Sequence, residues 1–409
     1  MTRLLAALLT LVVAAVAVAQ PATPQPKDDP LDRSTFKLST TPAAAPVPAS
    51  KYEFRVRQLD RLPGNAALDY LRAALLVPDG PRDAKEGEKL HAKLDAWEAT
   101  PLDELPIAEV TAYLDQFAGG FEALDAGARR EVVDWRQGVP LTQARIGDHL
   151  REIQRFREIA RLNGLRVRRD LARNEFEAAA KDLRSGFRLA QAVGEGPVVI
   201  QLLVGVSIGV VTVGQADRFV GCPGAPNLYH ALAGLPRPLI DPRPALEGEA
   251  MFADRALKES VPLALGGFGR YRPLRDDLQR AFGLPYHRAA AVFKTIRERA
   301  VEMKKNDLTP AGSLFELTIP ALEKTYHGFA RLDRRMAGLT AVEAVRLHAA
   351  GNKGTPPSAL ADITAVSVPS DPFTARPFEY AARADGFTLT APEDSASPGS
   401  GFRYVVTFR

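Results

Sequence analysis

The sequence has a single cysteine, Cys222, among 409 residues. A disulfide framework is therefore excluded, and the fold has to rely on the burial of apolar side chains even in an oxidising compartment. The six histidines show neither an H-E-x-x-H motif nor the paired spacing typical of zinc ligands. The sequence therefore predicts no metal site and no cofactor.

Neither sign of charge dominates, because 53 Lys and Arg stand against 49 Asp and Glu, for a net charge of +4. Nucleic-acid binding normally needs a concentrated basic face, so we expect no nucleic-acid partner. One arginine-rich stretch, residues 151–173, could bind a polyanion or an anionic lipid. Alternatively, these arginines form a solvated helix face and pair with acids on adjacent helices. The arginines of this stretch are Arg151, Arg155, Arg157, Arg161, Arg166, Arg168, Arg169 and Arg173.

The first 19 residues have the pattern of a secretory signal peptide. Arg3 is an early cation, and the apolar stretch after it ends in the small residues Ala17, Val18 and Ala19. An uncleaved membrane anchor is the alternative, but a bilayer core needs roughly 20 apolar residues. We therefore expect an exported protein of the periplasm or cell envelope, or a secreted one, with a mature chain that starts at Gln20.

The length of the mature chain exceeds the roughly 250 to 300 residues at which one hydrophobic core stops growing, so two or three packed units are expected. Residues 20–50 are rich in Pro, Thr and Ala and are expected to form a flexible or extended tether. The divisions that we expect after the tether are a helical domain over 51–220, a Pro-rich connector over 221–249, a second helical region over 250–330, and a C-terminal α+β unit over 331–409.

Helical spacing is clearest over residues 141–194, where two apolar faces follow each other. We expect two antiparallel helices here. Asn174 is expected to cap the second helix together with Glu177, and Gly194 to be the left-handed residue that ends it. The pair resembles a tetratricopeptide-type pair, but only one good copy is evident and an array needs about three or more.

A shorter helix is predicted after Asn65, where an apolar run recurs at helical spacing and stops near Pro78 and Gly80. The residues of that run are Leu68, Leu71, Leu75 and Leu76. The last sixty residues change character, because aromatic and β-branched residues alternate with polar ones. The predicted fold is therefore mainly α, with a C-terminal three-stranded antiparallel sheet packed on the helix that ends at Ala350.

The C-terminal turns carry a resemblance to a known family. In order, they read Gly354-x-x-Pro-x-x-Leu360, Asp371-Pro-Phe, Pro377-Phe-x-Tyr380 and Asp385-Gly-Phe-x-Leu389. This segment, under a fifth of the chain, resembles the globular head of the major pseudopilins of type II secretion. The resemblance implies a small α+β head and a loop, at Glu393 and Asp394, that could coordinate calcium.

Two departures from that family bear on the assembly of a pseudopilus. Some 300 residues precede the head, and the leader lacks the Gly-Phe cleavage site and the acidic residue five positions later. Assembly into a pseudopilus is therefore not implied. Together with segment 235–241, the whole chain is similar to a group of uncharacterised exported bacterial helical proteins, a likeness that supplies no activity.

Ser207 lies in Gly205-Val-Ser-Ile-Gly209, which matches the G-x-S-x-G nucleophile elbow of α/β-hydrolases. That elbow needs a strand before the serine and a helix after it, whereas the surrounding pattern is helical. The same five residues are also G-x-x-x-G, which lets two helix backbones approach closely. We favour the second interpretation, with residues 197–214 as a buried helix. Its 18 residues, three of them polar, are marginal for crossing a membrane.

Five charged residues surround a proline-stiffened turn and could hold a ligand in a rigid setting. The alternative is a plain connector whose Pro244 starts the next helix, with two of the acids complementing the positive end of that helix. The candidate binding residues are Arg237, Asp241, Arg243, Glu247 and Glu249.

We expect a non-enzymatic exported helical protein that acts as an interaction or scaffold module of the cell envelope. Its partner is expected to be another envelope protein. The sequence leaves two alternatives open, a serine hydrolase that uses Ser207 and a membrane-associated component of a secretion apparatus. Oligomeric state does not follow from the sequence.

Overall fold

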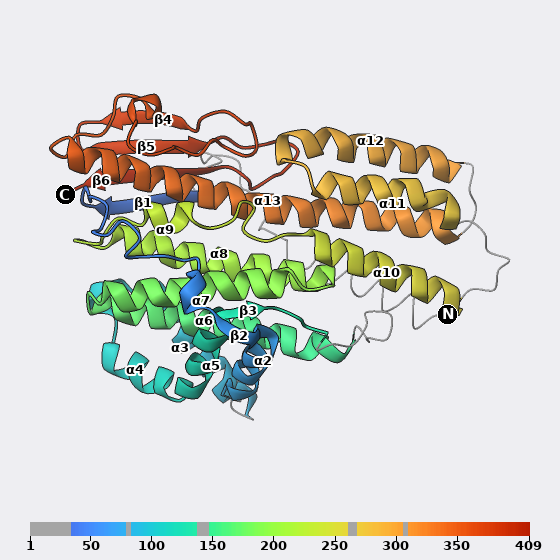
Figure 1. The fold of residues 1–409 in the computed structure, drawn as a ribbon, viewed down its shortest axis with the longest axis horizontal. Helices are drawn as coiled ribbons and strands as arrows, with labels where there is room; N and C mark the ends of the chain where they lie inside the picture. Colours follow the sequence, from blue (N-terminus) through green and yellow to red (C-terminus); the bar gives the residue numbers. More distant parts are fainter. Residues whose placement is uncertain (1–33, 79–82, 137–146, 261–267, 306–309) are drawn as a thin grey trace.

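The computed structural model describes residues 34–78, 83–136, 147–260, 268–305 and 310–409. Most of this chain is α-helical, and the helices form layers that run along the long axis of the molecule (Figure 1). A small sheet lies at one end of the upper layer. The predicted fold class, mainly α with a small C-terminal sheet, is confirmed at this level.

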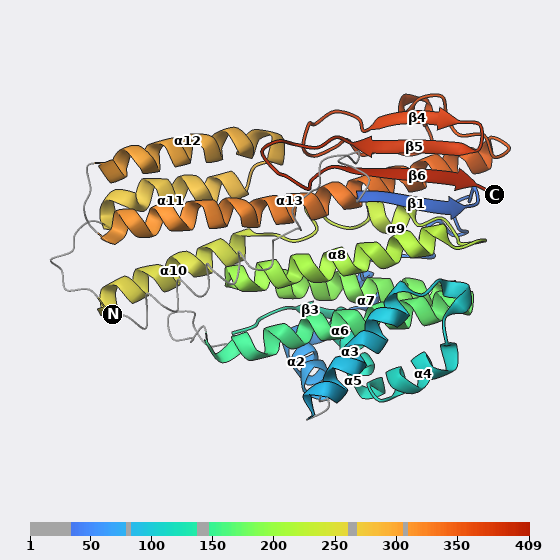
Figure 2. The same cartoon turned by 180° about the vertical axis from the view of Figure 1, so that it is seen from behind.

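The N-terminal helices form the lower layer, on the side of the central helices away from the sheet (Figures 1 and 2). Asn65 begins the first of them, because its side chain accepts a hydrogen bond from the backbone N of Ala67 at 3.1 Å. The elements of this layer are η2 (Gln58–Asp60), β2 (Leu62–Asn65), α2 (Ala66–Leu76), α3 (Ala84–Ala99), η3 (Leu102–Glu104), α4 (Ile107–Asp115), α5 (Ala118–Ala128) and β3 (Arg130–Val132).

Three long helices, α6 (Gly147–Ala172), α7 (Phe176–Gly194) and α8 (Val199–Gly221), form the central layer. The two helices predicted over residues 141–194 are therefore confirmed. Their predicted end signals are wrong. Asn174 has a φ of 58° and follows the end of α6, while Glu175 occupies the position before α7. An asparagine tolerates the left-handed conformation that ends a helix, so it terminates α6 and does not cap α7.

Gly194 is the last residue of α7 and gives close packing in place of the predicted left-handed turn. A Cβ atom on Gly205 would lie 2.4 Å from the Cα of Gly194, and one on Gly209 would lie 2.6 Å from Cδ2 of Leu332. The close approach of two helix backbones is therefore found at Gly205, against α7, whereas Gly209 packs on a leucine side chain of α13. Among the described helices, α8 alone is long and apolar enough to cross a membrane, yet 67% of its apolar window is buried inside the fold.

The upper layer is built around α13 (Pro310–Gly351), a helix of 42 residues that crosses the expected division at residue 330. It packs against α8 and carries the sheet on its C-terminal half. The expected connector, residues 221–249, contains a short helix and the start of the next one. The remaining helices of this part are α9 (Tyr229–Ala233), α10 (Arg243–Ser260), α11 (Phe268–Phe282), α12 (Tyr286–Lys305) and the 3-10 turn η4 (Leu360–Asp362).

The sheet is mixed and has four strands in the order β1-β6-β5-β4, one strand more than the predicted three-stranded antiparallel sheet. β4 (Glu379–Arg383), β5 (Gly386–Ala391) and β6 (Phe402–Phe408) are antiparallel neighbours. β1 (Thr35–Thr40) joins them in parallel to β6. The tether prediction is therefore wrong for these six residues. Leu38 and Thr40 of β1 are buried, and Thr40 Oγ1 donates to the carbonyl of Val220 at 2.6 Å.

Candidate functional site

Ser207 lies in the middle of α8, with helical residues on both sides, and its side chain is half-buried. The strand-to-helix elbow that exposes a nucleophilic serine is not formed at this position. The G-x-S-x-G match is therefore wrong as a catalytic signature, and its two glycines serve helix packing instead.

The proline-stiffened turn does not gather its five charged residues into one site. Arg237 is exposed as a whole residue, but its guanidinium group donates from Nη2 to Oγ1 of Thr340 on α13 at 2.8 Å. Burial lowers the pKa of Arg237. Asp241 and Arg243 form a pair near the surface, with Arg243 Nη2 at 2.5 Å from Asp241 Oδ2. The first is a contact with α13 and the second a local turn contact.

The two glutamates of the predicted site, Glu247 and Glu249, also lie in different environments. Glu249 accepts a hydrogen bond from the backbone N of Val199 at 3.0 Å, so it satisfies the start of α8, and burial raises its pKa. Glu247 is exposed. The predicted role of Glu249 at the positive end of its own helix is therefore wrong. The five residues of the predicted binding site contact different parts of the fold and do not converge on one point.

The arginines of α6 are used inside the protein, so the polyanion face is not formed by the side chains that the structure describes. Arg161 contacts Asp95 and Glu98 of α3. Arg168 is buried and donates to the carbonyl of Thr100. Arg161 and Arg166 pair with acids of adjacent helices, as the pairing interpretation expects, whereas Arg168 donates to a backbone carbonyl and Arg169 pairs with Asp170 of its own helix. The side chain of Arg151 lies outside the described part.

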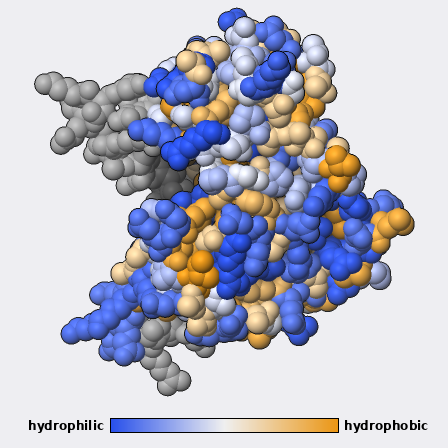
Figure 3. Space-filling model, turned by 90° about the vertical axis from the view of Figure 1, so that its left-hand side faces the viewer, coloured by the Kyte–Doolittle hydropathy of each residue, from blue (hydrophilic) through white to orange (hydrophobic). Residues whose placement is uncertain are grey.

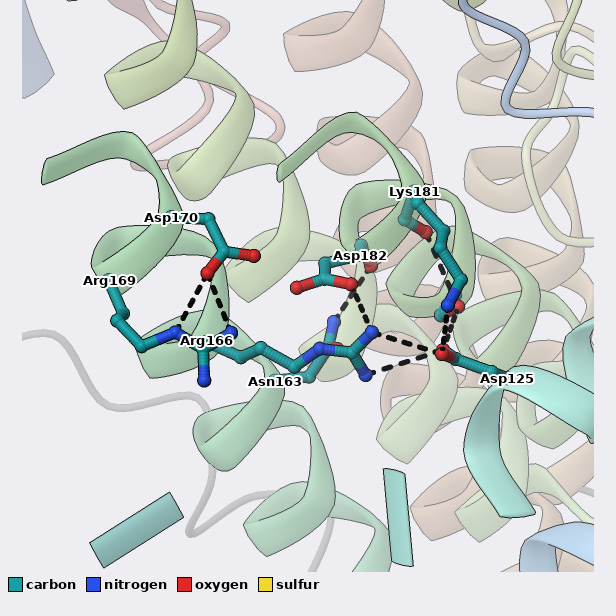
Figure 4. A network of polar contacts seen from close by, with 8 residues as sticks. Asp125, Asn163, Arg166, Arg169, Asp170, Lys181 and Asp182 are labelled. Carbon is teal, nitrogen blue, oxygen red and sulfur yellow. Dashed lines mark hydrogen bonds and ion pairs between the residues drawn. The ribbon is translucent and has the colours of Figure 1, made fainter. Parts of the chain in front are cut away.

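A buried charge network joins α5, α6 and α7 (Figure 4). Its centre is Arg166 of α6, which points between Asp125 of α5 and Asp182 of α7. The distance from Arg166 Nη2 to Asp125 Oδ2 is 3.0 Å. Lys181 Nζ lies 2.7 Å from the same oxygen, and Ser185 Oγ donates to Asp125 Oδ1 at 2.8 Å.

A third carboxylate, Asp170, lies beside Asp182 and pairs with Arg169 at 2.6 Å. Burial raises the pKa of Asp182 to about 8, assisted by the charge of Asp170 and against the attraction of Arg166. Burial also acts to raise the pKa of Asp125, but Arg166 and Lys181 outweigh it and the net shift is downward. At neutral pH, Asp182 therefore holds a proton while Asp125 is ionised.

This network connects three helices and can bind a proton. Asp170 and Asp182 are buried, with 1% and 0% exposure, and neither lines the small cavity beside Asn163 or the cavity of about 520 Å³ near residues 360–370. Sequence reasoning missed the network because its members come from three helices with no fixed spacing. The only signal was the polar Asp182 beside Leu183 on a face that is otherwise apolar.

The network predicts a pH dependence of stability that Asp182→Asn removes. The folded state holds a proton on Asp182 that the unfolded chain has released, because the pKa is about 8 in the folded state and near the ordinary aspartate value of 3.8 in the unfolded chain. The contribution of Asp182 to stability therefore falls as pH rises from about 4 to about 8. In urea unfolding at pH 5.5 and pH 8, the parent is expected to lose more stability than the variant. An equal loss in both proteins would contradict this assignment.

The loop at Glu393 and Asp394, for which the resemblance implied calcium binding, has both carboxylates hydrogen-bonded to backbone N–H groups of the same loop. Glu393 accepts from the backbone N of Gly401 at 2.7 Å, and Asp394 accepts from that of Ala396 at 2.8 Å. Among the described residues, no group of three or more metal-ligating side chains comes together. The larger of the two cavities, about 520 Å³, is lined by residues 360–361, 363–370 and Pro377, which include no titratable side chain.

The sequence did not indicate that α2 exposes apolar side chains. In the described residues, α2 carries three large apolar side chains that point away from the rest of the fold. Its buried face consists of small residues and Tyr70, which contacts Gly127 of α5 so closely that a Cβ there would lie 2.8 Å away. Three leucines point outward, and we call them the leucine ridge. Leu68 is 54% exposed, Leu75 77% and Leu76 42%. Large apolar side chains exposed together on one helix often mark an interaction site.

Comparison with known protein families, with curated proteins and with solved structures finds no match to this chain. What the protein does therefore has to be inferred from its own residues and surfaces.

Proposed function

We propose that this chain is a non-enzymatic exported protein that acts as an interaction or scaffold module of the cell envelope, and that the leucine ridge of α2 is its docking surface. The ridge is the observation that carries the proposal. An amphipathic helix in a folded domain normally turns its leucines toward the core, whereas α2 turns three of its four leucines outward and packs only Leu71 against the core.

The layers behind the ridge provide a rigid support for docking. α2 packs on α5, and the charge network ties α5 to α6 and α7. We infer that the α6–α7 hairpin is a tetratricopeptide-like pair that serves as a scaffold. The end of the molecule seen in Figure 3 is largely hydrophilic, with hydrophobic residues in small separate patches. A docking role is therefore better supported for α2 than for that end.

Two features support the proposal of a role outside the cytoplasm and without catalysis, namely the predicted export signal and the position of Ser207. The leader predicts transport, and the candidate nucleophile Ser207 lies within a packed helix. The predicted partner is accordingly a component of the envelope.

Photo-crosslinking from the ridge tests this proposal. A photoreactive amino acid at Leu75, in cells that export the protein, is expected to give covalent adducts with an envelope component. The same group at Glu88, an exposed position on α3, is the matched control and is expected to give none. Absence of adducts at Leu75, in a protein that is folded and exported, would refute the docking role.

A further inference from the structure

The chemistry of the leucine ridge includes a positive charge at its centre. Arg72 lies four residues after Leu68 and four before Leu76, so it is on the same face of α2. It is exposed and has no hydrogen-bond or ion-pair partner among the described residues. Asp69, the only acid of α2, is already paired with Arg130 at 2.7 Å. The ridge therefore offers leucines around an unneutralised guanidinium group.

The neighbouring elements add apolar and basic groups of the same kind. Leu59 of η2 is 98% exposed, and Val132 of β3, which pairs with Asn65 at the start of α2, is 52% exposed. Of the four arginines in residues 55–76, Arg57 pairs with Glu53 at 2.9 Å, and Arg72 is the arginine that lies on the ridge. The occupant of this surface should thus combine apolar and anionic character.

A second copy of this chain does not fit that description. A two-fold contact between two ridges brings the same surface together, so both copies of Arg72 would lie in one interface. No acid lies on the ridge to neutralise the two guanidinium groups. Like charges in direct opposition are destabilising, so self-association through the ridge is disfavoured.

The leucine ridge is better suited to contact a lipid surface than to form a large interface with another protein. Three leucines expose on the order of a few hundred Å², whereas a stable protein interface buries about 800 Å² on each partner. Leucine is also under-represented among the residues that dominate protein binding. In contrast, outward leucines with arginine between them are typical of helices that lie in the headgroup region of a membrane, where the arginine stem lies on apolar surface and its head contacts phosphate.

We propose that α2 is a peripheral membrane-docking helix that binds an anionic lipid surface, with Leu68, Leu75 and Leu76 inserted at the boundary of the acyl chains and Arg72 on a lipid phosphate. The proposal rests on the docking role of the ridge and names its partner. Because a single short helix buries little area, the binding is reversible and weakens with salt.

Vesicle flotation of the full mature chain tests the proposal. The protein is expected to float with vesicles that contain about one third phosphatidylglycerol in phosphatidylcholine, and to float much less with phosphatidylcholine alone. The double variant Leu68→Gln/Leu75→Gln is expected to lose binding by about tenfold or more, because two apolar side chains are no longer inserted among the acyl chains. Arg72→Gln should remove the preference for anionic vesicles, and Arg72→Lys should retain it.

Val301→Gln is the matched control, because Val301 is an exposed apolar residue on a different helix, α12. It is expected to float like the parent. Failure of the parent to float, or flotation that the ridge variants leave unchanged, would overturn the lipid assignment. If flotation fails while Leu75 crosslinks to a protein, the docking role stands and the lipid partner is wrong. If both fail, the proposed function fails as well.

Discussion

Arg334→Met is expected to lower the free energy of unfolding by about 3 to 5 kcal/mol, the cost of leaving one charge of a buried pair without its partner. Arg334 of α13 and Asp371 each expose 1% of their side chains, and Arg334 Nη2 lies 2.6 Å from Asp371 Oδ2. Arg334 also donates to the carbonyl of Ser400 at 3.0 Å, and its guanidinium carbon lies 4.4 Å from the centre of the Phe373 ring. One side chain thus joins α13 to the loops that flank the sheet.

The control for this prediction is a pair at the surface. Arg383 and Asp385 lie 3.2 Å apart with 41% and 52% of their side chains exposed. Arg383→Ala is expected to change stability by no more than about 1 kcal/mol. Chemical denaturation of the three proteins measures both effects. A loss for Arg334→Met as small as that for Arg383→Ala would show that the buried pair does not hold the sheet on α13.

The helical content of the middle of the chain was predictable because long helices repeat their apolar positions many times. Over residues 141–194 that repetition located α6 and α7, and two glycines four apart located the close contact of α8. Helix ends were less predictable. Asn174 suits both a cap and a left-handed terminator, and only the path of the chain decides between them.

The direction that a helix faces was not predictable from its own pattern. The spacing of Leu68, Leu75 and Leu76 indicates an apolar face and does not say which face is buried. In α2 the alanines and Tyr70 are buried because α5 approaches closely at Gly127. That contact depends on residues more than fifty positions away.

Contacts between residues far apart in the chain could not be predicted from the sequence either. β1 has only six residues in a segment rich in proline, and it becomes a strand because β6 offers a free edge more than 360 residues later in the chain. The charge network depends on three helices that meet at Arg166. The candidate nucleophile and the candidate turn failed for the same reason, since short motifs carry chemistry only where the fold brings their partners together.

The packing of α8 against α7 is the basis for describing its apolar window as the face of a buried helix. A matched pair of glycine substitutions in this helix tests it. At Gly205, an added Cβ would lie 2.5 Å from the backbone N of Gly194 and 2.6 Å from the carbonyl O of Ala190, atoms that cannot move aside without moving α7. At Gly214, an added Cβ would have no atom within 4 Å.

Gly205→Ala is therefore expected to destabilise the protein by about 1 to 3 kcal/mol, the usual cost of overpacking. Gly214→Ala is expected to stabilise it by about 0.5 to 1 kcal/mol, because alanine favours the helix. The measurement is the thermal unfolding midpoint of the two variants and the parent. We expect Gly205→Ala below the parent and Gly214→Ala at or above it. Equal midpoints for the two variants would contradict the burial of α8 against α7.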